Sequence, residues 1–256
     1  MSVVIKGVQT VIKGINTRIG PDITDTGLAL YLDAYNPESY PGTGTTWYDL
    51  SPNGNNGTLI NGPTFDPSLK SIILDGVNDY VNIPDSPSLD ITNALTLSAW
   101  VFVNGYPSNY PGIIAKGYGS TGAYSIHVRT QGDYQLWFDI ANNPTRQSFN
   151  PVGLGFLNLD ALFPRTGPKV STRWHNVVSV FNGTTLYIYL DGVLVDSVAS
   201  TISTLGATAD PVYIGRLPGF GYLQANVSVI MIHNIALNET QIIQNYNAIK
   251  GRYGLQ

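Results

Sequence analysis

The chain has 256 residues, of which only 12% are charged, with a formal net charge of -4 and no cysteine. A chain of this length can bury a sizeable core without disulfides, and its acidic balance does not suit nucleic acid, which is bound through clusters of Lys and Arg. No run approaches the roughly 18 apolar residues of a membrane span, so membrane insertion is not expected.

Residues 1–26 differ from the rest of the chain. They contain a degenerate repeat, VVIKGVQ followed by TVIKGIN, and they lack the apolar region and cleavage site of a secretory signal peptide. We interpret them as an N-terminal arm that docks onto a partner; the alternative is a strand pair or tail packed on its own domain. The apolar residues expected to contact the partner are Val3, Ile5, Val11 and Ile12.

The globular domain, residues 27–256, begins with short runs that are typical of strands. A stretch at residues 36–67 is dense in Gly, Pro, Asn and Thr, which indicates loops. The run at 95–103 is apolar on both faces, as in a central strand. The strands expected in this half are 27–33, 71–74, 80–83, 95–103, 112–116, 123–130 and 134–140.

Residues 171–197 predict an antiparallel meander of three strands. The pairs Asn182-Gly183 and Asp191-Gly192 separate the strands, because both tolerate the positive φ of hairpin turns. The middle strand alternates with a period of two. The residues expected to face the core are Leu186, Ile188 and Leu190, and further strands are expected at 212–215 and 226–233.

The clear helical pattern lies near the end of the chain. Asn238 is typical of an N-cap, Gln241 stands at the capping-box position, and Gly251 can end the helix. The expected apolar stripe is Ile242, Ile243, Tyr246 and Ile249. Many short strands with one terminal helix predict an all-β fold, a two-sheet antiparallel sandwich.

Several short motifs follow one another in a characteristic order: Leu28–Leu32, Trp47–Ser51 with Asn55–Gly57, Leu74–Val81, Leu97–Val101, Trp174–Val177, Leu190–Gly192 with Ile214–Gly215, and Asn234–Ile242. Together they resemble the laminin-G-like jelly roll of the concanavalin A-like lectin/glucanase superfamily, over about residues 27 to 254. The resemblance implies two sheets in jelly-roll order, often with bound calcium, and binding of glycans or of proteins.

The chain departs from the family's pattern in two places. The family usually carries an acidic residue in its last strand, where this chain has Asn226, and an insertion occupies about residues 143–169. The insertion is too apolar for a solvated loop, so we expect it either to cap its own sandwich or to contact another subunit. The residues expected to make that partner contact are Leu154, Phe156, Leu162 and Phe163.

Carboxylates for glycoside hydrolysis are scarce. That chemistry needs two carboxylates flanking one bond, and the glucanases of the superfamily carry a Glu-x-Asp-x-x-Glu run. This chain has only two glutamates, Glu38 and Glu239, and its three histidines share no metal-ligand spacing. We expect no enzymatic activity and no catalytic residues; a glycan-degrading enzyme that uses aspartates is a remaining alternative.

The turn after residue 74 is the candidate calcium site, with Asp75, Asn78 and Asp79 as its oxygen ligands. Calcium prefers carboxylate and carbonyl oxygens of this kind. The alternative is a turn in which Asp75 caps the bend and Asp79 accepts hydrogen bonds from backbone amides. No other cofactor is expected.

Two loops combine aromatic residues with small polar neighbours. The C–H faces of sugars stack on aromatic rings, while amides and backbone groups bind hydroxyls. The candidate glycan surface is Tyr106, Asn109, Tyr110, Phe220 and Tyr222. The alternative is ordinary packing between loops.

These features together resemble the laminin-G-like domains of tailed-bacteriophage structural proteins. The first hypothesis is a non-enzymatic virion structural protein, located in capsid decoration, fibre or tail and assembled in the host cytoplasm. Its arm would contact other virion proteins, its sandwich would contact cell-surface glycans, and it would form a homo-oligomer. A free carbohydrate-binding lectin module is the second hypothesis.

Overall fold

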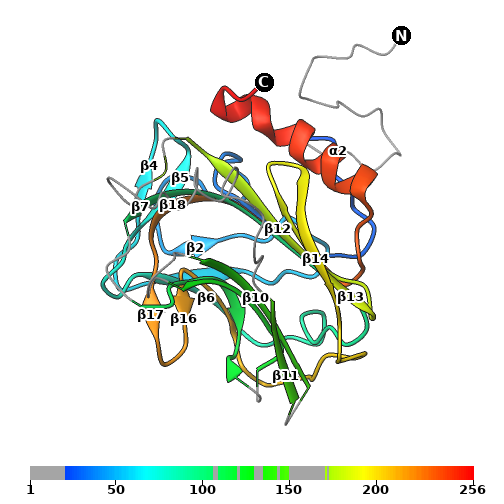
Figure 1. Ribbon diagram of the computed structural model, residues 1–256. Helices are drawn as coiled ribbons and strands as arrows, with labels where there is room; N and C mark the ends of the chain where they lie inside the picture. Colours follow the sequence, from blue (N-terminus) through cyan, green and yellow to red (C-terminus); the bar gives the residue numbers. More distant parts are fainter. Residues whose placement is uncertain are drawn as a thin grey trace.

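The computed structural model describes residues 21–105, 109–119, 122–129, 135–142, 145–149, 171 and 173–256 (Figure 1). Within these ranges two antiparallel sheets of eight strands each stack face to face, and helix α2 (Glu239–Lys250) lies on the outside of the first sheet. The predicted all-β jelly-roll sandwich with one C-terminal helix is confirmed. No helix of the described ranges is both long enough and apolar enough to cross a membrane.

The first sheet is centred on two long neighbouring strands, β7 and β18. In spatial order it contains β14 (Val193–Ala199), β13 (Thr185–Leu190), β12 (His175–Phe181), β7 (Leu95–Gly105), β18 (Gln224–His233), β5 (Ser71–Asp75) and β4 (Thr64–Asp66), and β1 (Leu28–Asp33) also pairs with β18.

The second sheet contains, in spatial order, β11 (Thr145–Phe149), β10 (Gln135–Asn142), β9 (Tyr124–Arg129), β8 (Gly112–Lys116), β15 (Val212–Ile214), β6 (Tyr80–Ile83), β3 (Gly57–Ile60) and β2 (Thr46–Trp47). A hairpin of β16 (Arg216–Leu217) and β17 (Gly221–Tyr222) follows β15. Strands β2, β3 and β4 lie in the stretch expected to be loop. Runs of two to four residues are too short to show a period of two, which is why the sequence pattern missed them.

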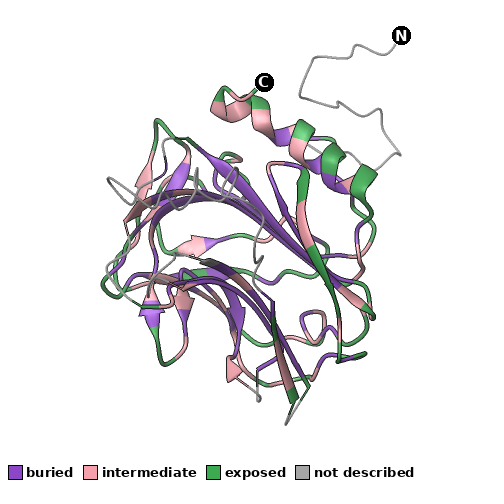
Figure 2. Ribbon diagram, viewed as in Figure 1, coloured by how far each residue is buried: buried purple, intermediate pink, exposed green. Residues whose placement is uncertain are grey.

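The core lies between the inner faces of the two sheets, where Figure 2 shows most of the buried residues. Strand β7 explains why a central strand is apolar on both sides. Leu97, Ala99 and Val101 face the core, while Trp100 faces outward and packs under the C-terminal segment, against Tyr246. Both faces of this strand are therefore covered.

The predicted meander is β12, β13 and β14, and its two turns are built differently. Asp191 and Gly192 both have positive φ, at 53° and 80°, which is the two-residue turn expected for this pair. At the other turn only Gly183 has positive φ, and the Asn182 side chain accepts hydrogen bonds from the amides of Thr184 and Thr185. The side chains of Leu186, Ile188 and Leu190 are buried in the core, as predicted.

Helix α2 begins with the predicted capping box between Asn238 and Gln241. The predicted apolar stripe is wrong at one position, because Ile243 is 38% exposed while Asn245 is buried. A step of 100° per residue places position 245, not 243, in line with the buried Ile242 and Ile249. The helix ends at Lys250, and the 3-10 turn η2 (Gly251–Tyr253) continues the chain.

Two predicted segments, the N-terminal arm (residues 1–26) and the insertion (about 143–169), are described only in part, and their boundaries stay predictions. On the arm's side of residue 26, Ile23 is buried and the amide of Thr24 donates a hydrogen bond of 2.7 Å to Asn245 Oδ1 on α2. Within the predicted insertion, residues 145–149 form β11, which extends the second sheet beside β10. The remaining residues of arm and insertion lie outside the described ranges.

Candidate functional site

The outer face of the second sheet carries the aromatic and charged side chains of its strands. Alternation along β9 and β10 buries Ile126, Val128, Leu136, Phe138 and Ile140 in the core. The alternate positions therefore point outward: Ser125, His127 and Arg129 on β9, and Trp137 and Asp139 on β10. Their register places Trp137 opposite His127 and Asp139 opposite Ser125.

A glycine-rich loop after β8 brings Tyr118 over this face. Gly117 and Gly119 have positive φ, at 64° and 77°, which L side chains rarely adopt. The Tyr118 ring meets the His127 ring edge to face, with centroids 5.6 Å apart. Its hydroxyl accepts a hydrogen bond of 2.8 Å from Arg146 Nη2.

The β16–β17 hairpin packs against β8 and also reaches this face, where it meets Tyr118. A Cβ added to Gly112 would lie 2.4 Å from the backbone oxygen of Arg216, so the hairpin can pack this closely only against a glycine. The tip of the hairpin holds Phe220, which is 52% exposed. Its ring contacts Tyr118 at 4.6 Å and Tyr110 at 5.6 Å between centroids.

These side chains form one continuous cluster, which we call the aromatic face; His127 is fully buried beneath the other four rings, which keep some solvent exposure. Its members are Tyr110, Tyr118, His127, Trp137 and Phe220, linked by ring-to-ring distances of 4.6 to 6.2 Å. They come from the segment before β8, the loop after it, two neighbouring strands and the hairpin. Edge-to-face contacts of this kind leave apolar ring surface on which a ligand can stack.

A charged pair fixes the inner side of the aromatic face. Arg146 of β11 forms an ion pair with the buried carboxylate of Asp139 and lies 4.4 Å from the Tyr118 ring centroid. Burial alone would lower the pKa of Arg146, but the Asp139 carboxylate and the Tyr118 hydroxyl together outweigh it and raise that pKa. Burial lowers the pKa of His127 to about 4, so its imidazole is neutral at physiological pH.

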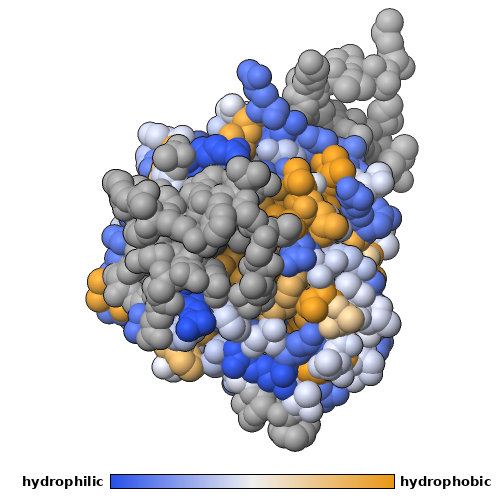
Figure 3. Space-filling model, in the orientation of Figure 1, coloured by the Kyte–Doolittle hydropathy of each residue, from blue (hydrophilic) through white to orange (hydrophobic). Residues whose placement is uncertain are grey.

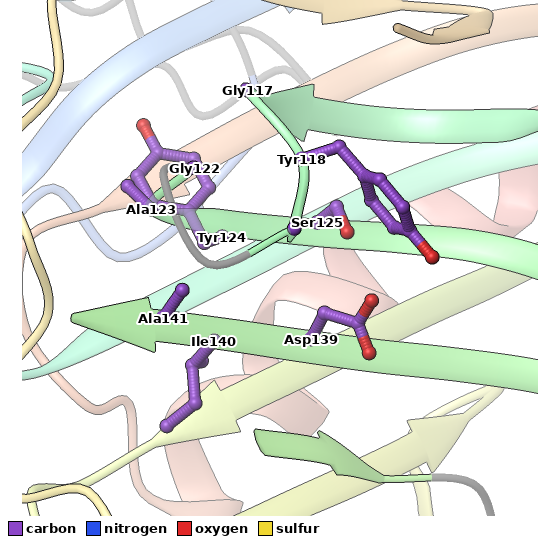
Figure 4. A pocket seen from close by; sticks show the side chains of 10 residues that line it. Gly117, Tyr118, Gly122, Ala123, Tyr124, Ser125, Asp139, Ile140 and Ala141 are labelled. Atoms are coloured by element: carbon purple, nitrogen blue, oxygen red, sulfur yellow. The ribbon is translucent and has the colours of Figure 1, made fainter. Parts of the chain in front are cut away.

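A small depression lies beside Tyr118, lined also by Ser125, Asp139 and the glycines of the loop (Figure 4). Figure 4 shows the Tyr118 ring and the Asp139 carboxylate on one side of it. The depression has room for about one water-sized group, so a ligand bound here would lie almost entirely on the open surface.

The predicted glycan residues divide between two places. Tyr110 and Phe220 belong to the aromatic face, and Asn109 is exposed next to Tyr110. Tyr222 lies instead in a second group, in which Arg216 sits 4.9 Å from the ring centroids of both Tyr80 and Tyr213 and 5.9 Å from that of Tyr222. Tyr106 lies outside the described residues.

The structure adds four residues that the loop-based prediction missed: Tyr118, His127, Trp137 and Arg146. A signal for Trp137 was present, because Trp137 and Asp139 alternate with the apolar residues of β10 and so must face outward. Nothing in the local sequence indicated that Tyr118 and Arg146, 28 residues apart, lie within hydrogen-bond distance.

The candidate calcium turn closes on itself. Asp75 Oδ1 accepts hydrogen bonds from the amides of Val77, Asn78 and Asp79, and Asp79 Oδ2 accepts one from the amide of Asp75. These amides outweigh the effect of burial and lower the pKa of the Asp75 carboxyl. One oxygen of each carboxylate is therefore already engaged. Calcium binding stays a prediction, which a calorimetric titration at millimolar calcium tests.

The remaining predictions concern catalytic or metal-binding groups and the residues that contact partners. Within the described ranges, no group of three or more His, Asp or Glu side chains is arranged to hold a metal ion. Asp139 is the carboxylate on the aromatic face, and Arg146 neutralises it. The predicted partner-contact residues lie outside the described ranges: Val3, Ile5, Val11, Ile12, Leu154, Phe156, Leu162 and Phe163.

Comparison with known families gives one match. The family described as the concanavalin A-like lectin/glucanases superfamily matches residues 75–243. That span covers most of both sheets, the β16–β17 hairpin and the start of α2. A search of curated proteins found no match.

Solved structures of the same fold include several binding domains. The binding domain of Paraclostridial Mosquitocidal Protein 1 superposes with a TM-score of 0.65 at 15% identity, covering 86% of this chain and 52% of that one. The binding domain of botulinum neurotoxin DC in complex with SialylT gives 0.66 at 14% identity, covering 88% and 52%.

A third solved structure belongs to botulinum neurotoxin type C, whose cell entry is dependent upon interaction with two ganglioside molecules. It gives a TM-score of 0.64 at 14% identity, covering 87% of this chain and 51% of that one. The present chain thus spans about half the length of these structures, and at such identities the likeness shows the fold alone.

Proposed function

Because this chain belongs to the concanavalin A-like lectin/glucanases superfamily, we propose that it is a non-enzymatic binding domain whose aromatic face takes up cell-surface glycans. The observation that carries the proposal is the convergence of four partly exposed rings from separate segments, Tyr110, Tyr118, Trp137 and Phe220, around the buried His127. Phe220 remains half-exposed there, although burying it would be favourable. A surface that keeps such rings accessible suits a ligand that stacks on them.

Features of the neighbouring structures support the same use of the fold. One was solved in complex with SialylT, and the cell entry of another depends on ganglioside molecules. For the present chain, sugar rings would stack on Phe220, Tyr118 and Trp137, since the negative faces of aromatic rings attract C–H groups. The depression beside Tyr118 would take one sugar substituent.

A glycan array followed by calorimetry on the strongest ligand tests this proposal. Phe220→Ala should weaken binding by about 5- to 150-fold, since stacking of a ligand ring on an aromatic side chain contributes roughly 1 to 3 kcal/mol. Tyr48→Ala is the matched control, because Tyr48 is 46% exposed and lies next to β2, at the far edge of the second sheet. Binding that is unchanged in both Phe220→Ala and Tyr110→Ala would exclude the aromatic face.

We also propose that the domain acts within a bacteriophage virion, with residues 1–26 anchoring it to other virion proteins. Support comes from the low charge, the absence of cysteine and the resemblance described above. Mass spectrometry of purified particles should find the chain at a stoichiometry that repeats between preparations. Absence from particles, together with binding of a defined sugar by the monomer, would favour the free lectin module instead.

The proposed homo-oligomer has a candidate surface at the edge of the first sheet. Strand β14 pairs only with β13 among the described strands, and it exposes Val193, Leu194 and Val198. Figure 3 shows hydrophobic surface gathered beside α2 on this side of the molecule. A second copy of the chain can cover such an edge. Light scattering should report an oligomer that Leu194→Lys dissociates; a wild-type monomer would exclude it.

A further inference from the structure

Arg129 stands apart from the other cations on the outer sheet face. It is the last residue of β9, two positions beyond His127, and its guanidinium carbon lies 5.8 Å from the centroid of the Trp137 ring. The side chain therefore borders the aromatic face at the end formed by Trp137. It contributes nothing to the sandwich core.

Most arginines in the described part of the chain have a protein partner for their charge. Arg146 pairs with Asp139, Arg173 with Asp191 and Arg252 with Asp33, while Arg216 lies among three tyrosine rings. Among the described residues, Arg129 has neither a carboxylate nor a hydrogen-bond acceptor. Its Nε–H is shielded from solvent without a partner, which is costly for a polar group.

The charge balance around Arg129 favours an anion. The carboxylate of Asp139 on this face is already neutralised by Arg146. His127 is neutral because burial lowers its pKa to about 4. Among the described residues, no carboxylate therefore offsets the charge of Arg129 at this end of the face, in a chain whose net charge is -4.

We propose that Arg129 binds the carboxylate of an acidic sugar, of the uronic or sialic acid type, whose ring stacks on Trp137. This inference rests on the proposed glycan-binding function. The planar guanidinium presents two parallel N–H groups that match the two oxygens of a carboxylate. Both oxygens of such a ligand are bound by the guanidinium, whereas the third oxygen of a sulfate would be left without a donor.

The experiment compares carboxylated oligosaccharides with their carboxyl-reduced, neutral forms and with sulfated ones on one array, for the wild type and Arg129→Gln. The wild type should bind the carboxylated form about 10- to 100-fold more tightly than the reduced form, as expected for hydrogen bonds to a charged group. Arg129→Gln should bind both forms equally. Arg129→Lys, which keeps the charge but loses the fork, should restore only part of the preference.

Arg173→Gln is the matched control, because it removes one cation from the edge of the first sheet and should leave the preference intact. Neutral glycans that bind as tightly as carboxylated ones, or a preference for sulfated glycans, would overturn the role of Arg129. If the wild type binds glycans in either of these ways and Phe220→Ala loses that glycan binding, the proposed function stands without the preference for an acidic sugar. Absence of all glycan binding overturns both. The wild-type comparison of acid and reduced forms decides the matter even if Arg129→Gln does not fold.

Discussion

The two sheets of the sandwich both carry aromatic residues on their outer faces, but those residues are covered on the first sheet and partly exposed on the second. On the first sheet, Trp100 and Trp174 are covered by α2 and the C-terminal turn, and the centroid of the Tyr253 ring lies 4.8 Å from that of Trp100 and 4.6 Å from that of Trp174. On the second sheet, Trp137 keeps exposed ring surface, as does Phe220 on the hairpin beside it. The same residue types are therefore structural where a helix covers them and available to a ligand where none does.

The largest expected effect is a loss of stability when Trp100, on the outer face covered by α2, is replaced. Trp100→Ala should lower the free energy of unfolding by about 3 to 5 kcal/mol, because Trp100 is fully buried and its loss leaves a cavity under α2. Urea unfolding followed by circular dichroism measures the change. Glycan binding by the folded fraction should be unaffected. A loss of affinity in that fraction would mean that the two faces are coupled.

The pH dependence of stability tests the buried part of the aromatic face. Burial lowers the pKa of folded His127 to about 4, against roughly 6.5 when unfolded, so between these values the unfolded chain binds a proton that the folded chain does not. Stability should be fully present above about pH 6.5 and fall by about 3 kcal/mol on the way to pH 4. His127→Gln should reduce this slope, measured by urea unfolding at several pH values. An unchanged slope would show that His127 is accessible to protons.

Phe220→Ala should reverse the pattern of Trp100→Ala. Its half-exposed ring at the hairpin tip contributes little to the core, so stability should change by less than about 0.5 kcal/mol while glycan affinity falls. Thermal melting and calorimetry on the same preparation provide the two readouts. Destabilisation comparable to that of Trp100→Ala would show that the aromatic face is packing rather than a binding surface.

The smallest effect on glycan affinity is expected for a change of Gly112, the glycine against which the hairpin packs. Gly112→Ala places a Cβ 2.4 Å from the Arg216 backbone oxygen, so the hairpin must move away from β8. Affinity should fall severalfold because Phe220 shifts relative to Tyr118. Gly251→Ala is the matched control, because a Cβ there meets open space and Gly251 has a helical φ. Gly44→Ala would not serve, because the φ of Gly44 is positive. Equal affinity in Gly112→Ala and wild type would contradict the positioning role of the hairpin.

Sequence patterns predicted the sandwich because its main strands and turns are locally encoded. The alternation at Leu186, Ile188 and Leu190 and the Asp191-Gly192 turn each depend on a few neighbouring residues. The candidate site is different, since it joins segments from β8 to the β16–β17 hairpin. Single loops pointed to Tyr110 and Phe220, but the contact of Tyr118 with both Phe220 and Arg146 arises only from tertiary packing.

The separation of tryptophans between the two faces and the core permits one direct measurement. Of the four tryptophans, Trp47, Trp100 and Trp174 are buried, and Trp137 alone lies on the aromatic face. Fluorine NMR of protein labelled with 5-fluorotryptophan, titrated with the oligosaccharide selected on the array, reports on each of them. The Trp137 resonance should shift in a saturable manner while the other three stay in place. A shift of Trp100 or Trp174 with Trp137 unchanged would place the glycan elsewhere and contradict the central claim.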